Sequence, residues 1–384
     1  MASKILMLHN YYLQSGGEDS VVINEVNTLR FNGFDVTLLK FNNTNYSTIN
    51  PLKYIFALNS IFSLSSFIRV YLFIKIKKIS ILHVHNFNYT ATPSVFWAAK
   101  LAGVKTIHTI HNYRLFCLNA MFYRNNKICF ECNLKQSLKP GIKYKCFKGS
   151  FFASLILAFT IKLHKILPTF DLFVDKYIVL NLFTKDLLLK FGIKNNKIFY
   201  KSNYLPNTAM VDVIKKEYYL YAGRLSYEKG MNHLIATFNS NKKPLIIAGD
   251  GDLRENLLNI KLDNIEFVGF KDKKSMITLM QEAKALIFSS IWIESMPMTI
   301  IESLSLGTIP IIAHSINTEK MIDDRINGIL YDANDSNGLN NAIDFFESLS
   351  SEQKNIMSQM AIQKFNILYS EKVHLEKIKD IYFN

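Results

Sequence analysis

Acidic residues are scarce in the first half of this 384-residue chain, and no segment has the composition of a disordered, collagen-like or mucin-like protein. Residues 1–205 hold 8 Asp and Glu against 26 Lys and Arg, a net charge of +18. Residues 206–384 hold 23 against 19, a net charge of −4, so the overall charge of +14 belongs to one half of the chain. With 49% hydrophobic and 20% charged residues, the sequence predicts a globular protein of two domains with different electrostatic partners.

Long hydrophobic runs are also missing. Lys4 leads directly into a strand-length apolar run at 5–8 instead of a secretory leader, so we expect a cytoplasmic protein. The most membrane-like segment, 54–76, is interrupted by polar residues and ends in lysines, which disfavours a spanning helix. This segment and 150–165 predict amphipathic helices that either pack on a sheet or lie on an anionic membrane surface.

Short apolar runs alternate with helix-length amphipathic stretches, which is typical of parallel sheets with crossover helices. We predict an α/β chain with a Rossmann-like domain at 1–205, a second at 206–366, and a helix at 367–384 that packs back on the first. Two such sheets would face a central cleft, where ligands meet the carboxyl ends of strands. Strands are expected at 4–9, 35–39, 80–85, 105–109, 176–180 and 197–201, and at 218–222, 244–248, 264–268, 285–289, 309–312 and 328–331.

Glycines follow the first predicted strand. Gly16 and Gly17 stand before an amphipathic stretch, where backbone N–H groups and a helix amino terminus favour an anionic ligand. The pattern is not GxGxxG, so a dinucleotide fingerprint is absent, and a plain tight turn is the alternative.

The second half carries a denser set of motifs at predicted strand ends. Gly223-Arg224-Leu225 and Lys229-Gly230 place two cations within a few residues, which suits a diphosphate. Gly249-Asp250-Gly251 forms another flexible turn. Pro297 is expected in a first helical turn, where the N–H groups of residues 298–300 form an anion site and Glu302 follows one turn later.

In this order and spacing, these motifs resemble the family-4 retaining glycosyltransferases (glycosyl transferases group 1) of the two-Rossmann-domain, GT-B type. Glu294, eight positions before Glu302, belongs to the same pattern. The Gly16-Gly17 loop and the segment 107–112 extend the resemblance over nearly the whole chain.

The resemblance implies a role for each matching residue. Arg224 and Lys229 would bind the diphosphate of a nucleotide-sugar, and Glu302 would accept hydrogen bonds from its ribose. Glu294 would contact the donor sugar, and His111 would lie close to the reacting sugar. The implied catalytic residues are His111, Arg224, Lys229 and Glu294. The implied donor-binding residues are Gly16, Gly17, Gly223, Arg224, Lys229, Gly251, Glu294, Met298, Thr299, Ile300 and Glu302.

The same resemblance implies the reaction and its partners. The expected activity is metal-independent, retaining transfer of a sugar from a UDP- or GDP-sugar to a polyprenyl-diphosphate-linked or lipid A-linked saccharide. The expected setting is bacterial capsule, O-antigen or lipopolysaccharide synthesis, at the inner face of the cytoplasmic membrane. A glycosidase pair of carboxylates is disfavoured, because such groups lie about 5 Å apart, whereas Glu294 and Glu302 are separated by Pro297 and two helical turns.

Histidines and cysteines raise the question of a metal. His83 and His85 share one face of a strand, but no carboxylate lies near them in the sequence, so structural or acceptor-contacting histidines are favoured. The four cysteines gather in a basic excursion at 112–150 with a single CxxC. Their count fits a structural zinc site, and reduced unligated thiols are the alternative. The candidate ligands are Cys117, Cys129, Cys132 and Cys146.

Two other classes of function are weighed against the transferase. A nucleic-acid-binding protein would explain a net charge of +18 on one domain, but no recognition module is present, and we expect no nucleic acid as partner. A nucleotide-sugar epimerase or a phosphorylase of the same fold remains open.

Overall fold

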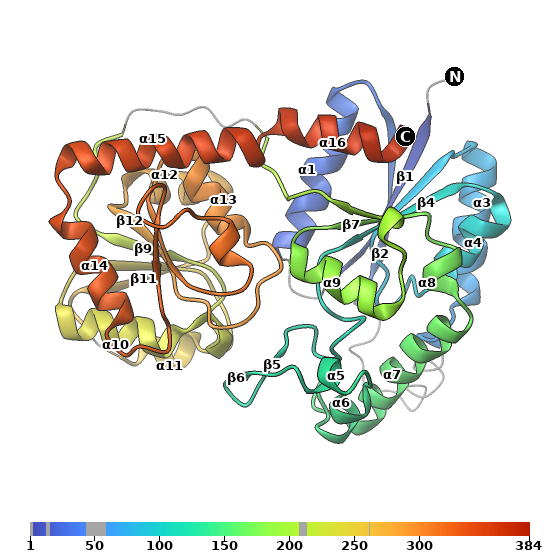
Figure 1. The fold of residues 1–384 in the computed structure, drawn as a ribbon, viewed down its shortest axis with the longest axis horizontal. Coiled ribbons are helices and arrows are strands. Elements are labelled where there is room, and N and C mark those ends of the chain that lie inside the picture. Colours follow the sequence, from blue (N-terminus) through green and yellow to red (C-terminus); the bar gives the residue numbers. More distant parts are fainter. Residues whose placement is uncertain (1–2, 13–15, 44–58, 207–212, 261) are drawn as a thin grey trace. The chain divides into compact units, whose positions relative to one another are not determined.

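The computed structural model describes residues 3–12, 16–43, 59–206, 213–260 and 262–384. These residues divide into two compact units, each of which is considered by itself (Figure 1). The first unit comprises Met1–Phe122, Cys129–Asn203 and His374–Asn384, and the second comprises Tyr123–Ile128 and Tyr204–Val373. The end of the chain is therefore part of the first unit. Part of the turn-forming segment between the halves, 207–212, lies outside the described residues.

The first unit is built on a parallel sheet in which six strands are described, in the order β2-β1-β3-β4-β7-β8. The order reverses between β1 and β3, which makes this the switch point at which ligands of doubly wound sheets bind. The strands are β1 (Lys4–Tyr11), β2 (Asp35–Asn42), β3 (Ile81–Asn86), β4 (Lys105–Ile110), β7 (Lys176–Val179) and β8 (Ile198–Tyr200).

Helices cover both faces of this sheet, and Figure 1 shows α1 on the side opposite to α3 and α4. Val26 and Leu29 of α1 and Ile378 of α16 join one core with Ile5 of β1. The principal helices are α1 (Gly17–Phe31), α3 (Leu64–Lys77), α4 (Ser94–Ala102), α7 (Phe151–Ile166), α8 (Thr169–Leu172), α9 (Leu182–Phe191) and α16 (Glu371–Phe383), with the 3-10 turn Asn195–Lys197.

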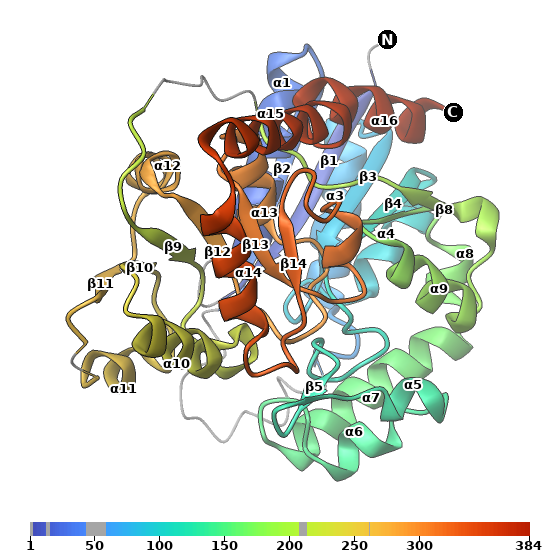
Figure 2. The ribbon, with the colours of Figure 1, turned by 60° about the vertical axis from the view of Figure 1, so that its left-hand side comes forward.

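The second unit repeats the plan with a parallel sheet, in which six strands are described in the order β11-β10-β9-β12-β13-β14. This is the Rossmann order, and its switch point lies between β9 and β12 (Figure 2). The strands are β9 (Tyr219–Ala222), β10 (Leu245–Ala248), β11 (Ile265–Gly269), β12 (Ala285–Phe288), β13 (Pro310–Ala313) and β14 (Ile329–Tyr331).

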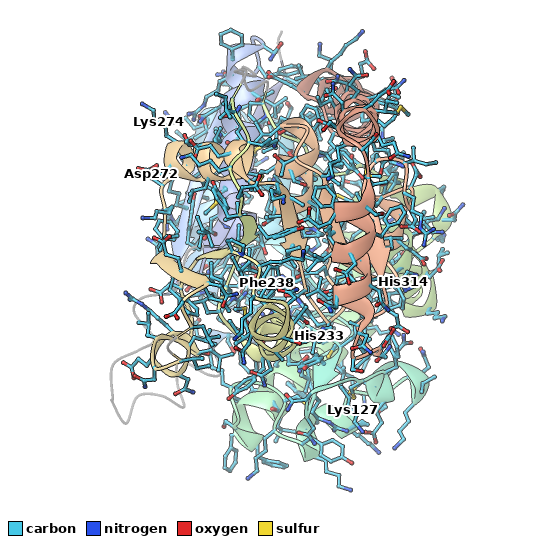
Figure 3. All side chains as sticks on the ribbon, turned by 90° about the vertical axis from the view of Figure 1, so that its left-hand side faces the viewer. Lys127, His233, Phe238, Asp272, Lys274 and His314 are labelled. Atoms are coloured by element: carbon cyan, nitrogen blue, oxygen red, sulfur yellow. The ribbon has the colours of Figure 1, made fainter. Side chains whose placement is uncertain are left out.

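The helices of the second unit also divide between two faces. Phe238 of α10 packs edge-on against Tyr219 with ring centres 5.5 Å apart, whereas Met280 of α12 joins the core on the other face. Figure 3 labels Phe238, and also Asp272, whose carboxylate caps α12 by accepting from the N–H of Ser275. The helices are α10 (Met231–Asn241), α11 (Arg254–Leu258), α12 (Lys273–Glu282), α13 (Met298–Ser305), α14 (Gly338–Ser348) and α15 (Ser351–Leu368), with 3-10 turns at Tyr227–Lys229 and Thr318–Lys320.

The two parallel sheets confirm the predicted fold class, and each predicted strand lies within a few residues of an observed one. The predicted helix 54–76 differs: its part 54–58 lies outside the described residues, and α3 begins only at Leu64. The helix begins there because Ser63 is its N-cap: the Ser63 hydroxyl accepts a hydrogen bond from the N–H of Ser66. The excursion 112–150 holds small elements that the hydrophobic pattern did not predict. They are the hairpin β5 (Tyr123–Arg124) and β6 (Lys127–Ile128), and helices α5 (Glu131–Leu134) and α6 (Lys139–Lys143).

Candidate functional site

Glycines in the second unit allow the loops after β9 and β10 to touch. Gly249 has φ +152°, and a Cβ there would lie 1.8 Å from the carbonyl oxygen of Gly223. A Cβ on Gly251 would lie 2.5 Å from the carbonyl oxygen of Leu225. These predicted motif glycines therefore shape the strand-end loops through backbone packing, which brings the residues after β9 to the switch point.

Lys229 and Glu294 form an ion pair at this switch point, one following β9 and the other following β12. Lys229 was predicted to bind the diphosphate and Glu294 to contact the donor sugar. The structure brings the two side chains into direct contact. The Glu294 carboxylate also accepts from the hydroxyl of Ser290 at 2.7 Å and from the indole N–H of Trp292 at 2.8 Å. A carboxylate with several fixed donors is held in one orientation.

The loop that carries Glu294 is fixed from a second direction. Asn317 donates its side-chain N–H to the carbonyl oxygen of Glu294 at 2.6 Å. The hydroxyl of Ser289 donates to the carbonyl oxygen of Lys229 at 2.8 Å. Sequence reasoning missed Ser289, Ser290, Trp292 and Asn317, and the only signal for them was their position directly after β12 and β13.

Helix α13 starts at Met298, so Pro297 is the residue before the helix and does not stand in its first turn as predicted. Its φ of −71° and ψ of 118° are extended, because a capping residue precedes the helical dihedral angles. The N–H groups of residues 298–300 then occupy the first turn, where they have no partner within the helix. This places the predicted anion-binding positions Met298, Thr299 and Ile300 at a helix amino terminus beside Glu294.

Unlike Lys229 and Glu294, which bind each other, the side chains of Glu302 and Arg224 are not paired within the described part of the chain. Among the described residues, neither the Glu302 carboxylate nor the Arg224 guanidinium has a hydrogen-bond or ion-pair partner within the distances of such bonds. Burial raises the pKa of Glu302, and the nearby Lys273 opposes that shift. Arg224 is exposed, and only its carbonyl oxygen is engaged, by the hydroxyl of Tyr221 at 2.8 Å. Both side chains have bonding capacity left for a ligand.

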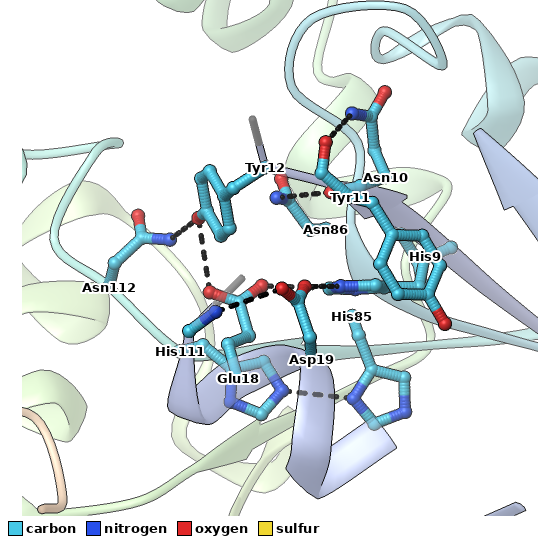
Figure 4. Close-up of polar contacts among 12 residues, drawn as sticks. His9, Asn10, Tyr11, Tyr12, Glu18, Asp19, His85, Asn86, His111 and Asn112 are labelled. Atoms are coloured by element: carbon cyan, nitrogen blue, oxygen red, sulfur yellow. Dashed lines mark hydrogen bonds and ion pairs between the residues drawn. The ribbon is translucent and has the colours of Figure 1, made fainter. Parts of the chain in front are cut away.

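The corresponding edge of the first unit is crowded with polar side chains. Gly16 caps α1, and its N–H donates to the Asp19 carboxylate at 3.0 Å. The other oxygen of Asp19 lies 2.7 Å from His9 Nε2 (Figure 4). Gly16 has φ −133°, and a Cβ added there would have nothing within 4 Å, so this residue leaves space beside the helix terminus. Gly17 is the first residue of α1.

A second group of contacts surrounds the Glu18 carboxylate. It accepts from the hydroxyl of Tyr12 at 3.0 Å, and Asn112 donates to that same hydroxyl at 3.0 Å. Burial raises the pKa of Glu18 to about 7. Arg114 donates to the hydroxyl of Tyr89 at 2.7 Å. This group joins the ends of β1 and β4 to the start of α1.

His111 follows β4 as predicted, and its Nε2 lies 2.9 Å from Nδ1 of His85 (Figure 4). Behind this pair stands Glu25 of α1, whose Oε1 is 3.5 Å from His83 Nδ1 and 3.9 Å from His85 Nε2. The expectation that no carboxylate lies near these histidines was therefore wrong. Glu25 is 60 positions away in the sequence from His85, and helix α1 carries it to the sheet.

Glu25, His83 and His85 bring ligand atoms within 4.8 Å of one another, the only such group of three among the described residues. Both nitrogens of His83 are already engaged, one by the hydroxyl of Tyr382 and one by that of Thr109, each at 2.7 Å. The second oxygen of Glu25 lies 3.2 Å from the Lys201 ammonium. The group is a buried polar network in which His83 and the second Glu25 oxygen are engaged, whereas Glu25 Oε1 and His85 Nε2 have no hydrogen-bond partner among the described residues.

The four cysteines form no disulfide. In the part of the chain that the structure describes, no three of their sulfur atoms come within 4.8 Å of one another. Burial raises the pKa of Cys132 to about 11 and also raises that of Cys117, which favours the protonated thiol. A structural zinc at Cys117, Cys129, Cys132 and Cys146 remains a prediction, which elemental analysis of the purified protein tests.

A hollow in the first unit opens at the ends of β3 and β4, and His85, His108, His111, Asn112 and Arg114 are among the residues that line it. Burial lowers the pKa of His108 to about 4 and lowers the pKa values of His85 and His111 well below the usual range. These imidazoles are therefore neutral at pH 7 and act as hydrogen-bonding groups.

Two parallel-sheet units with sites at their switch points define a class of protein, the GT-B fold. A glycosyltransferase from Rickettsia africae has this fold with a TM-score of 0.68 at 18% identity, over 99% of this chain and 98% of that one. Anabaena HepE in complex with UDP gives a TM-score of 0.67 at 13% identity, over 99% of both chains.

Sequence comparison identifies the family of the second unit. The family model described as glycosyl transferases group 1 matches residues 212–364. O-antigen chain mannosyltransferase C of Escherichia coli is 23% identical over 162 residues, which are 40% of this chain and 43% of that protein. In the curated relatives, the match covers between 27% and 43% of the relative's length. Through residues 212–364 the chain is similar to the group 1 glycosyltransferases, and its two units have the GT-B fold.

Proposed function

We propose that this chain is a family-4 type, retaining glycosyltransferase that needs no metal ion for catalysis. It moves a sugar from a nucleotide-diphosphate donor, bound by the second unit, to a lipid-linked saccharide acceptor, bound by the first. The observation that carries the proposal is the β9–β12 switch point. There Lys229 and Glu294 are in contact, the N–H groups of Met298 to Ile300 begin α13, and Arg224 and Glu302 have unused bonding capacity.

The chemistry of these groups fits a nucleotide-sugar. The Arg224 and Lys229 cations and the α13 amino terminus suit a diphosphate, because all of them favour negative charge. Glu302 is a hydrogen-bond acceptor suited to a pair of ribose hydroxyls, and Glu294 to hydroxyls of the sugar. As the bond to the sugar breaks, charge builds up on the diphosphate, and fixed donors stabilise that charge in the transition state. Anabaena HepE, which shares the fold, was crystallised with UDP, which supports a nucleotide donor.

Bacterial surface polysaccharide is the setting that we propose for the acceptor. The O-antigen chain mannosyltransferase among the relatives supports an O-antigen or lipopolysaccharide product, and a capsule is the other surface polysaccharide that fits. A polyprenyl-diphosphate or lipid A carrier would present negative charge to the first unit. No Asp or Glu occurs between Asp35 and Glu131, so that unit has cations to receive it.

A membrane surface is the proposed partner of helices α3 and α7. Leu64, Ile68, Leu72 and Ile76 recur every fourth residue of α3 and are 62%, 46%, 48% and 72% exposed. Residues four apart share one helix face, so this apolar stripe points to solvent, where a water-facing helix is normally polar. Neither α3 nor α7 contains an acidic residue.

Helix α7 has a similar exposed face. Phe151, Phe152, Leu155 and Phe159 are between 41% and 64% exposed, and Lys162 and Lys165 follow them. Exposed apolar side chains flanked by lysines fit the inner face of the cytoplasmic membrane, whose lipids are anionic. Every helix that the structure describes is too short or too polar to cross a bilayer, so the proposed attachment is peripheral.

Transfer is tested with purified protein, UDP- and GDP-sugars, and lipid-linked acceptors, with the configuration of the new bond read by NMR. We expect retained configuration, activity in the presence of EDTA, and a loss of about 100-fold or more in Lys229→Ala. Lys274→Ala, at the exposed start of α12 (Figure 3), is the matched control and should keep full activity. Inverted configuration would overturn the retaining mechanism. Full activity of Lys229→Ala would overturn the donor site, and conversion of the donor without transfer would favour an epimerase or a phosphorylase.

Membrane attachment is tested separately by co-sedimentation with vesicles. The double variant Leu72→Glu, Ile76→Glu should lose at least tenfold in affinity for phosphatidylglycerol-containing vesicles, because it places charge in the apolar stripe. Neutralising Lys75, Lys77 and Lys78 should also weaken binding, by about 1 kcal/mol for each lysine. Ile356→Glu, at a position of α15 that is 54% exposed, is the control. Unchanged binding in both α3 variants would contradict this surface.

A further inference from the structure

His111 is connected to the interior of the first unit by a short chain of polar contacts. Its Nε2 lies 2.9 Å from Nδ1 of His85, and the other nitrogen of His85 lies 3.9 Å from the Glu25 carboxylate. Figure 4 shows the two imidazoles side by side beneath Glu18 and Asp19. His85 and Glu25 are 2% and 1% exposed, so both side chains are buried.

Glu25 sets the polarity of this chain. Its Oε2 forms an ion pair with the Lys201 ammonium at 3.2 Å, and both side chains are buried. A carboxylate can only accept hydrogen bonds, so the Oε1 that faces His85 favours a proton on Nε2 of that ring. Among the described residues, His85 Nε2 has no hydrogen-bond partner, so the electrostatic attraction of the Glu25 carboxylate at 3.9 Å decides which nitrogen of the ring carries the proton.

The proton positions then follow along the chain. A neutral imidazole carries one proton, so His85 with its proton on Nε2 has a lone pair on Nδ1. The neighbouring atom, Nε2 of His111, must then donate, and His111 carries its own proton there. Burial lowers the pKa values of both rings well below the usual range, so neither carries a second proton at pH 7. The remaining nitrogen of His111, Nδ1, is left with a lone pair.

We infer that Glu25 and His85 are positioning residues that hold His111 in its Nε2–H tautomer, so that its Nδ1 accepts a hydrogen bond from a hydroxyl group of the bound saccharide. This inference rests on the proposed function for the identity of the ligand. It assigns to His111 the part of a neutral acceptor and excludes that of a cation or proton donor. His111 itself is half-buried and belongs to the lining of the hollow at the ends of β3 and β4.

The opposite arrangement uses the same distances. If His85 carried its proton on Nδ1, it would donate to His111, and the lone pair of His85 Nε2 would face the Glu25 carboxylate. Two acceptors would then face each other inside the protein, which is unfavourable where the local dielectric is low. The carboxylate of Glu25 therefore decides the direction of the hydrogen bond.

The tautomer is measured directly on the full chain labelled with ¹⁵N-histidine, without ligand and without an activity assay. The His85 and His111 signals are assigned from their absence in His85→Asn and His111→Asn. We expect both rings to be neutral at pH 7, with the proton on Nε2 in each. A proton on Nδ1 of His111, or a doubly protonated ring, would overturn the inference. This readout stays valid even if the chain proves not to be a glycosyltransferase.

Variants separate positioning from a general structural role. His85→Leu should lower kcat about tenfold with little change in KM for the donor, because the orientation of His111 is lost. His85→Asn should restore most of the rate, because its amide oxygen replaces Nδ1 as an acceptor for His111. Thr109→Val removes the bond to the neighbouring His83 and should leave the His111 tautomer and kcat unchanged. Equal rates in His85→Leu and His85→Asn would contradict the positioning role.

Discussion

The two units use charged side chains differently at the carboxyl edges of their sheets. In the first unit, Glu25 and Lys201 are 1% and 2% exposed and pair with each other. In the second unit, Arg224 is exposed and Glu302 is half-buried, and neither has a bonded partner among the described residues. The charges of the first arrangement are paired inside the protein, whereas those of the second are open to a ligand.

This difference teaches that charge alone does not mark a binding site. A buried ion pair holds its neighbours in place. Here these are the histidines of β3 and, through the contact of His83 with Tyr382, the end of α16. An accessible charged group without a partner can still bind a ligand.

Each unit contains one tryptophan, Trp97 in the first and Trp292 in the second. The fluorescence of a Trp292→Phe variant therefore reports on the first unit, and that of a Trp97→Phe variant reports on the second.

The largest expected effect comes from breaking the buried pair. Lys201→Ala leaves Glu25 as an uncompensated buried charge and should lower the free energy of unfolding of the first unit by about 3–5 kcal/mol. This loss is measured by unfolding the protein in denaturant while the fluorescence of Trp97 is recorded. Lys216→Ala, which removes an exposed pair with Glu282, should cost no more than about 1 kcal/mol. Similar losses in the two variants would show that the Glu25 pair is not a buried anchor of the first unit.

The next effect concerns the loop packing of the second unit. Gly249→Ala would place a Cβ 1.8 Å from the Gly223 carbonyl oxygen, so the backbone must shift, at a cost of about 3 kcal/mol. Trp292 fluorescence during unfolding should show this loss. Gly16→Ala in the first unit meets nothing within 4 Å and has an ordinary φ, so its effect should stay within about 0.5 kcal/mol. A stable Gly249→Ala variant would contradict the packing of these loops.

Acid should destabilise the first unit in particular. The pKa of His108 is about 4 in the folded unit and about 6.5 when unfolded, so below pH 6.5 the unfolded chain binds the extra proton. Its contribution to stability is therefore full at pH 7 and falls by about 2 kcal/mol between pH 6.5 and 5. His83, His85 and His374, whose pKa values are also lowered by burial, act in the same direction. In the His108→Gln variant, the free energy of unfolding of the first unit, measured by Trp97 fluorescence, should change less with pH. The same change with pH as in the unaltered protein would argue against a neutral buried His108.

The smallest change in stability is expected at the open site. Arg224→Ala should leave the free energy of unfolding within about 0.5 kcal/mol, because the guanidinium has no bonded partner to lose. It should nevertheless weaken UDP or GDP binding about tenfold, the cost of one charge-assisted hydrogen bond. Calorimetric titration measures the affinity, and Arg325→Ala, 67% exposed on its side chain, is the control. Equal affinities in both variants would remove Arg224 from the donor site.

Much of the fold was predictable from the sequence because local patterns determine it. The apolar runs of both halves predicted the strands, and the glycines at 223, 249 and 251 marked the ends of strands β9 and β10. The hairpin of β5 and β6 was not predictable, because two-residue strands have no periodicity to detect. The start of α3 was placed too early, because apolar residues continue upstream of the Ser63 cap.

The sites were predictable only in part. Arg224, Lys229, Glu294 and Glu302 stand in motifs directly after strands, where position in the chain implies position in the site. Glu25 and Lys201 stand in no motif, and they meet because α1 and the end of β8 converge on the same sheet. The contact between Lys229 and Glu294 likewise depends on the β9–β12 adjacency, which no local motif marks.

We propose that the second unit binds a nucleotide-sugar at the β9–β12 switch point, and one measurement tests this directly. Trp292 donates to the Glu294 carboxylate there at 2.8 Å, so its fluorescence should respond to a ligand at that site. The direct measurement is a titration of the Trp97→Phe variant with UDP-, GDP- and ADP-sugars. We expect a saturable change in fluorescence with a UDP- or GDP-sugar, and we expect Glu302→Ala to abolish it. No response to any of these donors, or the same response in Glu302→Ala, would contradict it.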